Sequence, residues 1–217
     1  MPLPVFSEAY ITQRLHEGQK TQQKPSNLWE FLTESPRPAA VLIPLYLSES
    51  PGVEHETWQV LLTRRTNSVA EHQGQVAFPG GRADTTDTTP EMTALREAHE
   101  EIGLDPTKVR ILGRMKSLHT ISNYMVTPIV GVIQWPFAVC LEETEVSRVF
   151  SIPLDWLADP NHHEIRNRTI PEPFGKILHK DVHPVIYFQS YDDELLWGVS
   201  AEITVRLIDI LYKKAGD

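Results

Sequence analysis

The segment at residues 78–104 constrains the fold of this chain more than any other. It begins with Phe-Pro-Gly-Gly, continues through a polar stretch, and ends with Arg-Glu-Ala-His-Glu-Glu-Ile-Gly-Leu. Near its end, Leu95, Ala98 and Ile102 are spaced three or four residues apart, which is typical of the buried face of a helix. Glycine commonly follows the last turn of a helix. We therefore predict a core-facing helix that ends at Gly103.

Three glutamates, Glu97, Glu100 and Glu101, share another face of this predicted helix, because positions i, i+3 and i+4 lie together. Carboxylates placed this way repel one another by roughly 0.2–0.5 kcal/mol per pair. A solvated acidic face is the commoner explanation of such a pattern. Two features favour a functional role instead: Arg96 can hold the Glu100 carboxylate from one turn away, and a tight glycine turn precedes the helix. An oxygen-rich face beside such a turn suits a hard divalent cation such as Mg²⁺.

At these residues the sequence resembles the Nudix hydrolases, whose box reads G-x5-E-x7-R-E-U-x-E-E-x-G-U, where U is a bulky aliphatic residue. Gly81 and the run from Arg96 to Leu104 match the two ends of the box. Asp87 replaces the first glutamate, and the gap from Asp87 to Arg96 is one residue longer than in the box. Ala98 is small for the aliphatic position. The longer gap is similar to that of the coenzyme A pyrophosphatase branch of the family.

The residues upstream of the box, 61–81, are similar to the signature of that branch, L-L-T-x-R-[S/A]-x3-R-x3-G-x3-F-P-G-G. Thr66 stands in place of serine or alanine, and Ala70 stands where the signature has its second arginine. An arginine at that position can bind a phosphate through two hydrogen bonds, whereas alanine cannot. Three nearby arginines are candidates to replace it: Arg64, Arg65 and Arg82. An exposed arginine near a turn is, however, more often only a solubilising charge.

The resemblance implies an enzyme that uses Mg²⁺ or Mn²⁺ to hydrolyse a diphosphate bond. Such a cation neutralises the charge of the phosphates and activates water. The metal-binding glutamates of the family correspond to Glu97, Glu100 and Glu101. Arg96 is then a partner that orients these ligands. The backbone of the Gly80-Gly81 turn is expected to form a wall that the substrate approaches closely.

The general base has two candidates. One is a glutamate of the box, Glu100 or Glu101, and the other is Glu145, at the end of the acidic run at residues 142–145. Nudix enzymes often supply a further carboxylate from a loop after the box, which favours Glu145, although a solvated acidic loop explains the run equally well. Tyr124 is a candidate to stack on an adenine ring, and packing at a strand edge is the alternative role for it.

Three functions follow from these residues. The foremost is hydrolysis of coenzyme A or an acyl derivative to 4′-phosphopantetheine and adenosine 3′,5′-bisphosphate. The second is the same chemistry on ADP-ribose or a dinucleotide, which Ala70 makes credible. The third is a nucleotide-binding sensor without hydrolytic activity, against which the complete set of glutamates argues.

Composition indicates which classes of ligand the protein binds and where in the cell it is expected. The net charge of −9 argues against attraction to nucleic acid. No apolar run approaches the ~20 residues of a membrane span, and the first residues lack the pattern of a secretory signal. We therefore expect a cytoplasmic protein with a small-molecule substrate. The single cysteine, Cys140, excludes an internal disulfide and is interpreted as a small apolar filler.

We expect two parts in the chain: a helical N-terminal extension at residues 1–38 and a Nudix hydrolase domain at residues 39–217. The extension is expected to form two short helices, the first with Ile11 and Leu15 directed inward and the second at residues 26–32. It packs either on the domain or on a second subunit, so a homodimer is one arrangement that the sequence leaves open.

The remaining elements follow from hydrophobic periodicity. Strands are expected at residues 39–47, 58–63, 109–118, 126–134, 146–152 and 185–190, and a final helix at residues 200–214. Pro128 is expected to delay the start of its strand, because proline cannot donate a ladder hydrogen bond. Ser200 is expected to cap the final helix. Strands mixed with helices predict an α/β fold, and the resemblance implies the Nudix-type α/β/α sandwich with a mixed central sheet.

Overall fold

The computed structural model describes residues 6–20, 35–49, 56–66, 74–170, 172 and 181–212. A mixed sheet lies at the centre of the protein. Its strands are β1 (Arg37–Glu49), β2 (Glu56–Arg65), β3 (Val76–Ala77), β4 (Gly80–Arg82), β5 (Val109–Arg114), β6 (Leu118–His119), β7 (Tyr124–Ile133) and β8 (Val146–Pro153). The path β3-β2-β1-β7-β5 is joined by β4 on β1, β6 on β7 and β8 on β2. Strands β1 and β7 are parallel and the other pairs are antiparallel. The sheet is therefore mixed, as predicted.

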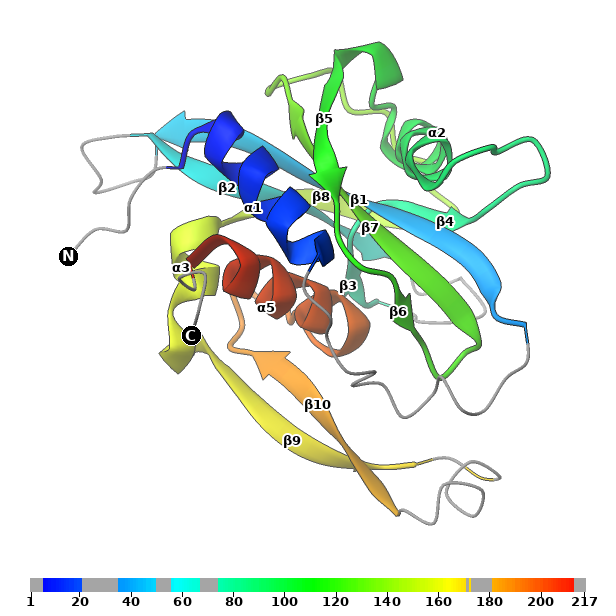
Figure 1. Cartoon of the computed structure of the whole chain (residues 1–217), viewed down its shortest axis with the longest axis vertical. Helices are drawn as coiled ribbons and strands as arrows, with labels where there is room; N and C mark the ends of the chain where they lie inside the picture. The colour runs from blue at the N-terminus through cyan, green and yellow to red at the C-terminus, as the bar shows by residue number, and fades with distance from the viewer. Residues whose placement is uncertain are drawn as a thin grey trace.

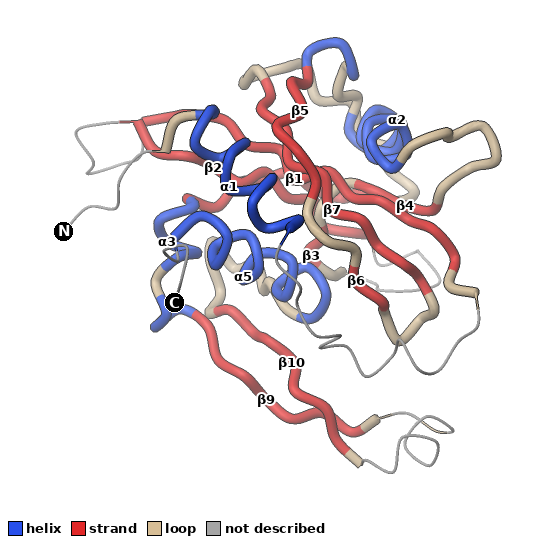
Figure 2. Tube along the Cα trace, viewed as in Figure 1, coloured by secondary structure: helices blue, strands red, loops and turns tan. Residues whose placement is uncertain are grey.

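Helices cover both faces of this sheet (Figures 1 and 2). Helix α2 (Pro90–Ile102) lies on one face, and α1 (Glu8–Lys20) and α5 (Gly198–Tyr212) lie on the other. Side chains alternate accordingly along β1, because Leu42 packs with residues of α2 whereas Ile43 packs with residues of α1 and α5. Two hydrophobic clusters thus sandwich the sheet, which confirms the predicted α/β/α arrangement.

A hairpin projects from the α5 side of the sheet (Figure 1). It consists of β9 (His163–Thr169) and β10 (Val182–Phe188), which form a separate antiparallel sheet of two strands. The short helix α3 (Leu154–Ala158) and the 3-10 turn η3 (Pro160–His162) lead into the hairpin, and another 3-10 turn, η2 (Pro106–Lys108), precedes β5.

Helix α1 packs directly on the domain. Ile11 and Leu15 are buried in the same cluster as the inner side chains of α5. The Tyr10 hydroxyl donates a hydrogen bond to the backbone oxygen of Leu211, and the Arg14 Nε–H donates one to that of Ile210. The first helix of the extension therefore belongs to the hydrophobic core, whereas the second expected helix lies outside the described residues.

Four local predictions were wrong. The single strand expected at residues 109–118 is divided into β5 and β6. Strand β7 runs through Pro128, because its neighbour is interrupted there between β5 and β6, and the Pro128 carbonyl accepts a hydrogen bond from Met115. Helix α5 begins before Ser200, at Gly198. The preceding Trp197 still bridges Tyr187 of β10, so the chain turns at Gly198 with a φ of 67°, a conformation that favours glycine. Cys140 is exposed rather than buried.

No helix within the described ranges is long and apolar enough to cross a membrane.

Candidate active site

The ends of helix α2 are defined by local hydrogen bonds. Thr89 caps the first turn, because its hydroxyl oxygen accepts a hydrogen bond from the Met92 N–H at 3.2 Å. Gly103 ends the helix with a φ of 72°, and its N–H reaches the carbonyl oxygens of Ala98 and His99. The predicted C-terminal glycine is thus confirmed. The side of the helix that carries Ala94, Ala98 and Ile102 packs in the core.

The glycine turn lies against the carboxylates of α2. The Gly80 N–H donates a hydrogen bond to Glu101 Oε2 at 3.1 Å. A Cβ at Gly80 would lie 2.5 Å from the backbone of β1, and a Cβ at Gly81 would lie 2.5 Å from Glu97 Oε2. Because neither position has room for a side chain, the two glycines allow the turn to approach Glu97 and Glu101 closely.

Arg96 binds three carboxylates at once. Its Nη1 lies 2.9 Å from Glu97 Oε1 and 3.0 Å from Glu100 Oε2, while its Nε and Nη2 donate to Asp87. Nη2 also donates to the Arg82 carbonyl at 3.0 Å. The hydrogen bonds from Arg96 lower the pKa of Asp87 to about 2, and the same contacts raise the pKa of Arg96. The predicted Arg96–Glu100 contact is therefore present, and Asp87 anchors the arginine from its other side.

Glu101 is the most buried of the helix glutamates, with 4% of its surface exposed. Its burial raises its pKa to about 8, and the charges of Glu97 and Glu145 act in the same direction. Burial likewise raises the pKa of Glu97, again with a contribution from Glu145. Arg65 opposes this effect at Glu101, since its Nη1 lies 3.7 Å from Glu101 Oε1. A second guanidinium nitrogen, Nη2, lies 3.9 Å from Glu145 Oε2.

The structure thus brings together most of the residues singled out in the sequence. Eight of them surround the glycine turn and the facing side of α2: Arg65, Gly80, Gly81, Arg96, Glu97, Glu100, Glu101 and Glu145. Glu145 belongs to a loop far along the chain, yet its backbone oxygen accepts a hydrogen bond from the Thr66 N–H at the end of β2. This contact places the loop beside Arg65.

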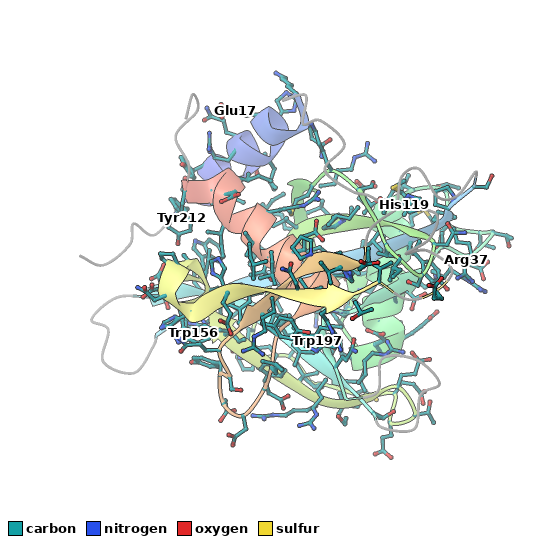
Figure 3. All side chains as sticks on the ribbon, turned by 90° about the horizontal axis from the view of Figure 1, so that it is seen from below. Glu17, Arg37, His119, Trp156, Trp197 and Tyr212 are labelled. Carbon is teal, nitrogen blue, oxygen red and sulfur yellow. The ribbon has the colours of Figure 1, made fainter. Side chains whose placement is uncertain are left out.

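Three other predicted residues lie differently. Arg64 is directed to the opposite face of β2 from Arg65, where it binds Glu194 at 3.3 Å. Tyr124 packs on the α1 and α5 side of the sheet, with the Arg37 guanidinium 4.1 Å from its ring centre, and Arg37 lies at one end of the molecule (Figure 3). Arg82 contributes its backbone carbonyl, and its side chain is exposed.

The donor set fits a hard divalent cation in its chemistry, because it consists of carboxylate oxygens beside a turn without side chains. In the described part of the chain, however, no three acidic, histidine or cysteine side chains converge on one point. Arg96 instead lies between the carboxylates of Glu97 and Glu100. A cation would compete with this guanidinium for the same oxygen atoms.

Asp87 in the site and Glu194 outside it had no role assigned from the sequence. Asp87 carries a signal, because it occupies the acidic position of the box after Gly81. The sequence around Glu194 gives almost no signal of a role, because one glutamate next to a leucine pair is typical of an ordinary surface charge. Only the tertiary structure shows that Glu194 is buried and binds two arginines.

Comparison with known proteins matches this chain to a protein family. A family model described as NUDIX domain matches residues 36–172. The chain is 32% identical over 202 residues to the uncharacterized Nudix hydrolase NudL of Yersinia pestis (strain Pestoides F), covering 91% of this chain and 93% of that protein. The same values hold for NudL of Yersinia pseudotuberculosis serotype O:1b (strain IP 31758).

Two solved structures of Nudix proteins align with parts of this chain. The Nudix hydrolase RenU of M. smegmatis aligns with a TM-score of 0.46 and 24% identity over 58% of this chain and 76% of that chain. A MutT/nudix family protein from Enterococcus faecalis aligns with a TM-score of 0.48 and 14% identity over 92% of this chain and 71% of that chain. Nudix hydrolases generally use a divalent cation such as Mg²⁺ or Mn²⁺. From the family model and the NudL relatives, we conclude that this chain belongs to the Nudix hydrolase family and is a Nudix pyrophosphatase.

Proposed function

We propose that this enzyme hydrolyses the diphosphate bond of coenzyme A or an acyl derivative, with Mg²⁺ or Mn²⁺ as the cofactor. The products are 4′-phosphopantetheine and adenosine 3′,5′-bisphosphate. One observation carries the chemistry: Arg65 lies within 3.7 Å of Glu101 and 3.9 Å of Glu145, so a loop carboxylate stands beside the glutamates of α2. The substrate class is supported by the sequence of residues 61–81, which is similar to the coenzyme A branch.

The residues of α2 and those of the neighbouring loop have different roles in the reaction. Glu97, Glu100 and Glu101 hold the cation, which when bound neutralises phosphate charge and lowers the pKa of a water molecule. Glu145 is the general base, because its side chain is 48% exposed and can reach a water molecule in front of the helix. Arg65 lies between the Glu145 and Glu101 carboxylates and compensates their charge. The water oxygen attacks one phosphorus while Glu145 takes a proton from the water, the bond from that phosphorus to the bridging oxygen breaks, and the leaving phosphate departs with the electron pair of that bond.

The glycine turn admits the substrate. Since a side chain at Gly81 would meet the Glu97 carboxylate, only a glycine leaves room for a diphosphate next to these oxygens. The position normally held by a second arginine of the coenzyme A signature is Ala70, which lies outside the described residues. Ala70 is the observation that favours a second candidate, a pyrophosphatase for ADP-ribose or a dinucleotide.

A substrate panel separates these functions. The purified protein is assayed with Mg²⁺ or Mn²⁺ on coenzyme A, ADP-ribose and a reduced dinucleotide, and the products are identified by mass. We expect coenzyme A to have the highest kcat/KM, and a Glu97→Gln variant from the same preparation controls for contaminating hydrolases. A higher kcat/KM for ADP-ribose or the dinucleotide would favour the second candidate. Ligand binding without turnover would instead indicate a nucleotide sensor.

A further inference from the structure

A buried carboxylate outside the candidate active site binds two arginines. Glu194, between β10 and α5, has only 3% of its surface exposed. Its Oε1 lies 3.3 Å from Arg64 Nη1 and 3.1 Å from Arg148 Nη1. Burial of a carboxylate is costly unless cations or hydrogen-bond donors compensate it. The two arginines provide that compensation, and each comes from a different strand of the central sheet.

These two arginines face each other at an irregularity of the sheet. Arg64 of β2 pairs with Arg148 of β8, but the next residue, Arg65, pairs with Val146. Ser147 is therefore an extra residue in β8, and its hydroxyl donates a hydrogen bond to the Arg64 carbonyl at 3.1 Å. An extra residue of this kind is a β-bulge, which changes the direction of nearby side chains and is common next to active sites.

Arg64 and Arg65 lie next to this bulge and point to opposite faces of β2. Arg64 is directed toward Glu194 on one face of β2, and Arg65 is directed toward Glu101 on the other. The Arg65 N–H also donates to the Gln75 carbonyl at 2.9 Å, which fixes the backbone beside β3. Because Arg64 and Arg65 are consecutive, a change in the pairing of Arg64 moves Arg65 relative to the carboxylates that it contacts.

We propose that Glu194 is a positioning residue for Arg65. By binding Arg64 and Arg148 across the bulge, it fixes the pairing of β2 with β8 and so holds Arg65 between Glu101 and Glu145. The segment that connects the hairpin to α5 is thereby coupled to the active site. The kinetic consequence of this proposal depends on the proposed function, whereas its structural consequence does not.

Hydrogen exchange tests the structural consequence. In Glu194→Gln, we expect the amides of Arg65 and Thr66 to exchange about tenfold faster, because the bulge opens more often. The matched control is Asp192→Asn, which removes a second, exposed partner of Arg148 but leaves Glu194 in place. Asn also tolerates the positive φ of Asp192. Equal exchange rates at both amides in Glu194→Gln and wild type would overturn the proposal.

Kinetics test whether Glu194 acts through Arg65. We expect Glu194→Gln to lower kcat about tenfold in the wild-type background, and to change it by less than about twofold in an Arg65→Gln background. A purely structural role of Glu194 would lower kcat by the same factor in both backgrounds, and this additive result would overturn the proposal. If the wild-type enzyme hydrolyses none of the panel substrates, the proposed function fails, and hydrogen exchange alone decides on Glu194. Should Glu194→Gln not fold, Arg148→Gln replaces it in both tests, because that side chain is 43% exposed.

Discussion

Arg96 illustrates how a single residue organises the candidate site. It binds Glu97 and Glu100 with one nitrogen and Asp87 with two others. Asp87 therefore anchors Arg96, although it is not one of the glutamates that are proposed to bind the cation. Its side chain is only 4% exposed whereas that of Arg96 is 27% exposed, so the ion pair is partly shielded from solvent. Removal of one partner from such a pair leaves the other charge without compensation.

Asp87→Asn is expected to destabilise the protein in a pH-dependent way. The pKa of Asp87 is lowered to about 2 in the folded state. A lowered pKa stabilises the fold above the unfolded-state pKa, and the stabilisation is lost as the pH falls through the folded-state pKa. Urea unfolding should therefore show wild type more stable by about 1–2 kcal/mol at about pH 7, with a difference that shrinks below about pH 4. Glu202→Gln removes a partly exposed ion pair within one helix and is the control. A difference independent of pH would contradict the role of Asp87.

Gly81→Ala tests the close approach of the turn to α2. A Cβ would lie 2.5 Å from the Glu97 carboxylate and displace it. We expect kcat to fall at least about tenfold, with a smaller effect on the urea midpoint than a core substitution has. Gly18→Ala is the matched control, since a Cβ there makes only ordinary contacts with Ile210. Wild-type kcat in Gly81→Ala would show that the position of Glu97 does not matter.

Ala70→Arg restores the second arginine of the coenzyme A signature. If that position binds a phosphate of coenzyme A, kcat/KM for coenzyme A should rise about tenfold, as expected for a new hydrogen bond between charged groups. The kcat/KM for ADP-ribose should change much less. A similar change for every substrate would reject the phosphate-binding role.

At the scale of elements, the candidate active site depends on the contact between the loop at residues 142–145 and the end of strand β2. The loop at residues 142–145 is joined to the end of β2, because Thr66 donates hydrogen bonds to the carbonyls of Thr144 and Glu145. A further backbone hydrogen bond within the loop, from Glu145 to Glu142, closes the turn. The loop backbone is therefore anchored while the Glu145 side chain remains half exposed.

Glu145→Gln is expected to slow turnover by roughly 10²–10⁴-fold, which is the usual contribution of a general base. Glu143→Gln is the matched control, because Glu143 is an exposed acidic residue of the same loop. The measurement is kcat at saturating substrate and cation for both variants. A decrease of similar size in both, or a small one in Glu145→Gln, would assign the base to a glutamate of α2.

At the scale of the whole molecule, α1 completes the cluster on the α5 side of the sheet. The Trp58 indole donates a hydrogen bond to the Phe6 carbonyl at 2.8 Å, directly before this helix. Leu15 of this helix packs against Gly113, and a Cβ at Gly113 would lie 3.3 Å from the Leu15 side chain. These contacts tie the N-terminal segment to strands β2 and β5. The boundary of the Nudix hydrolase domain at residue 39 stays a prediction.

Leu15→Ala is expected to destabilise the whole protein by about 2–5 kcal/mol, because it leaves a cavity in a buried cluster. Urea unfolding, followed by fluorescence and by circular dichroism, should show a single transition at a lower midpoint. Gln13→Ala, on the exposed side of α1, is the control. An unchanged midpoint, or a separate early transition for α1, would mean that the extension is not part of the core.

Sequence patterns predicted those features of the fold that depend on residues close together in the sequence. The period of Ala98 and Ile102, together with Gly103, gave the position of α2 and the face that carries its glutamates. Alternation along β2 implies that Arg64 and Arg65 point to opposite faces. Which face belongs to the active site depends on β8 and α2, which are distant in sequence, so the sequence left both arginines as candidates.

Other features had no local signal. The hairpin strand β9 is almost entirely exposed, and it therefore lacks the alternation of apolar residues that marks a half-buried strand. Pro128 is tolerated within β7 only because the neighbouring strand is interrupted beside it. Burial of Glu194 likewise depends on two arginines from other strands. Each of these features is decided by tertiary contacts rather than by composition or period.

The carboxylates of α2 are the centre of the proposed mechanism, and a crystal of the enzyme soaked with Mn²⁺ tests them most directly. We predict an anomalous difference peak within coordination distance of Glu97, Glu100 and Glu101, next to Gly81, with Arg96 displaced from the Glu97 and Glu100 carboxylates. The same preparation must hydrolyse a diphosphate substrate in the presence of Mn²⁺. An active enzyme with no peak at these carboxylates would contradict the proposed mechanism.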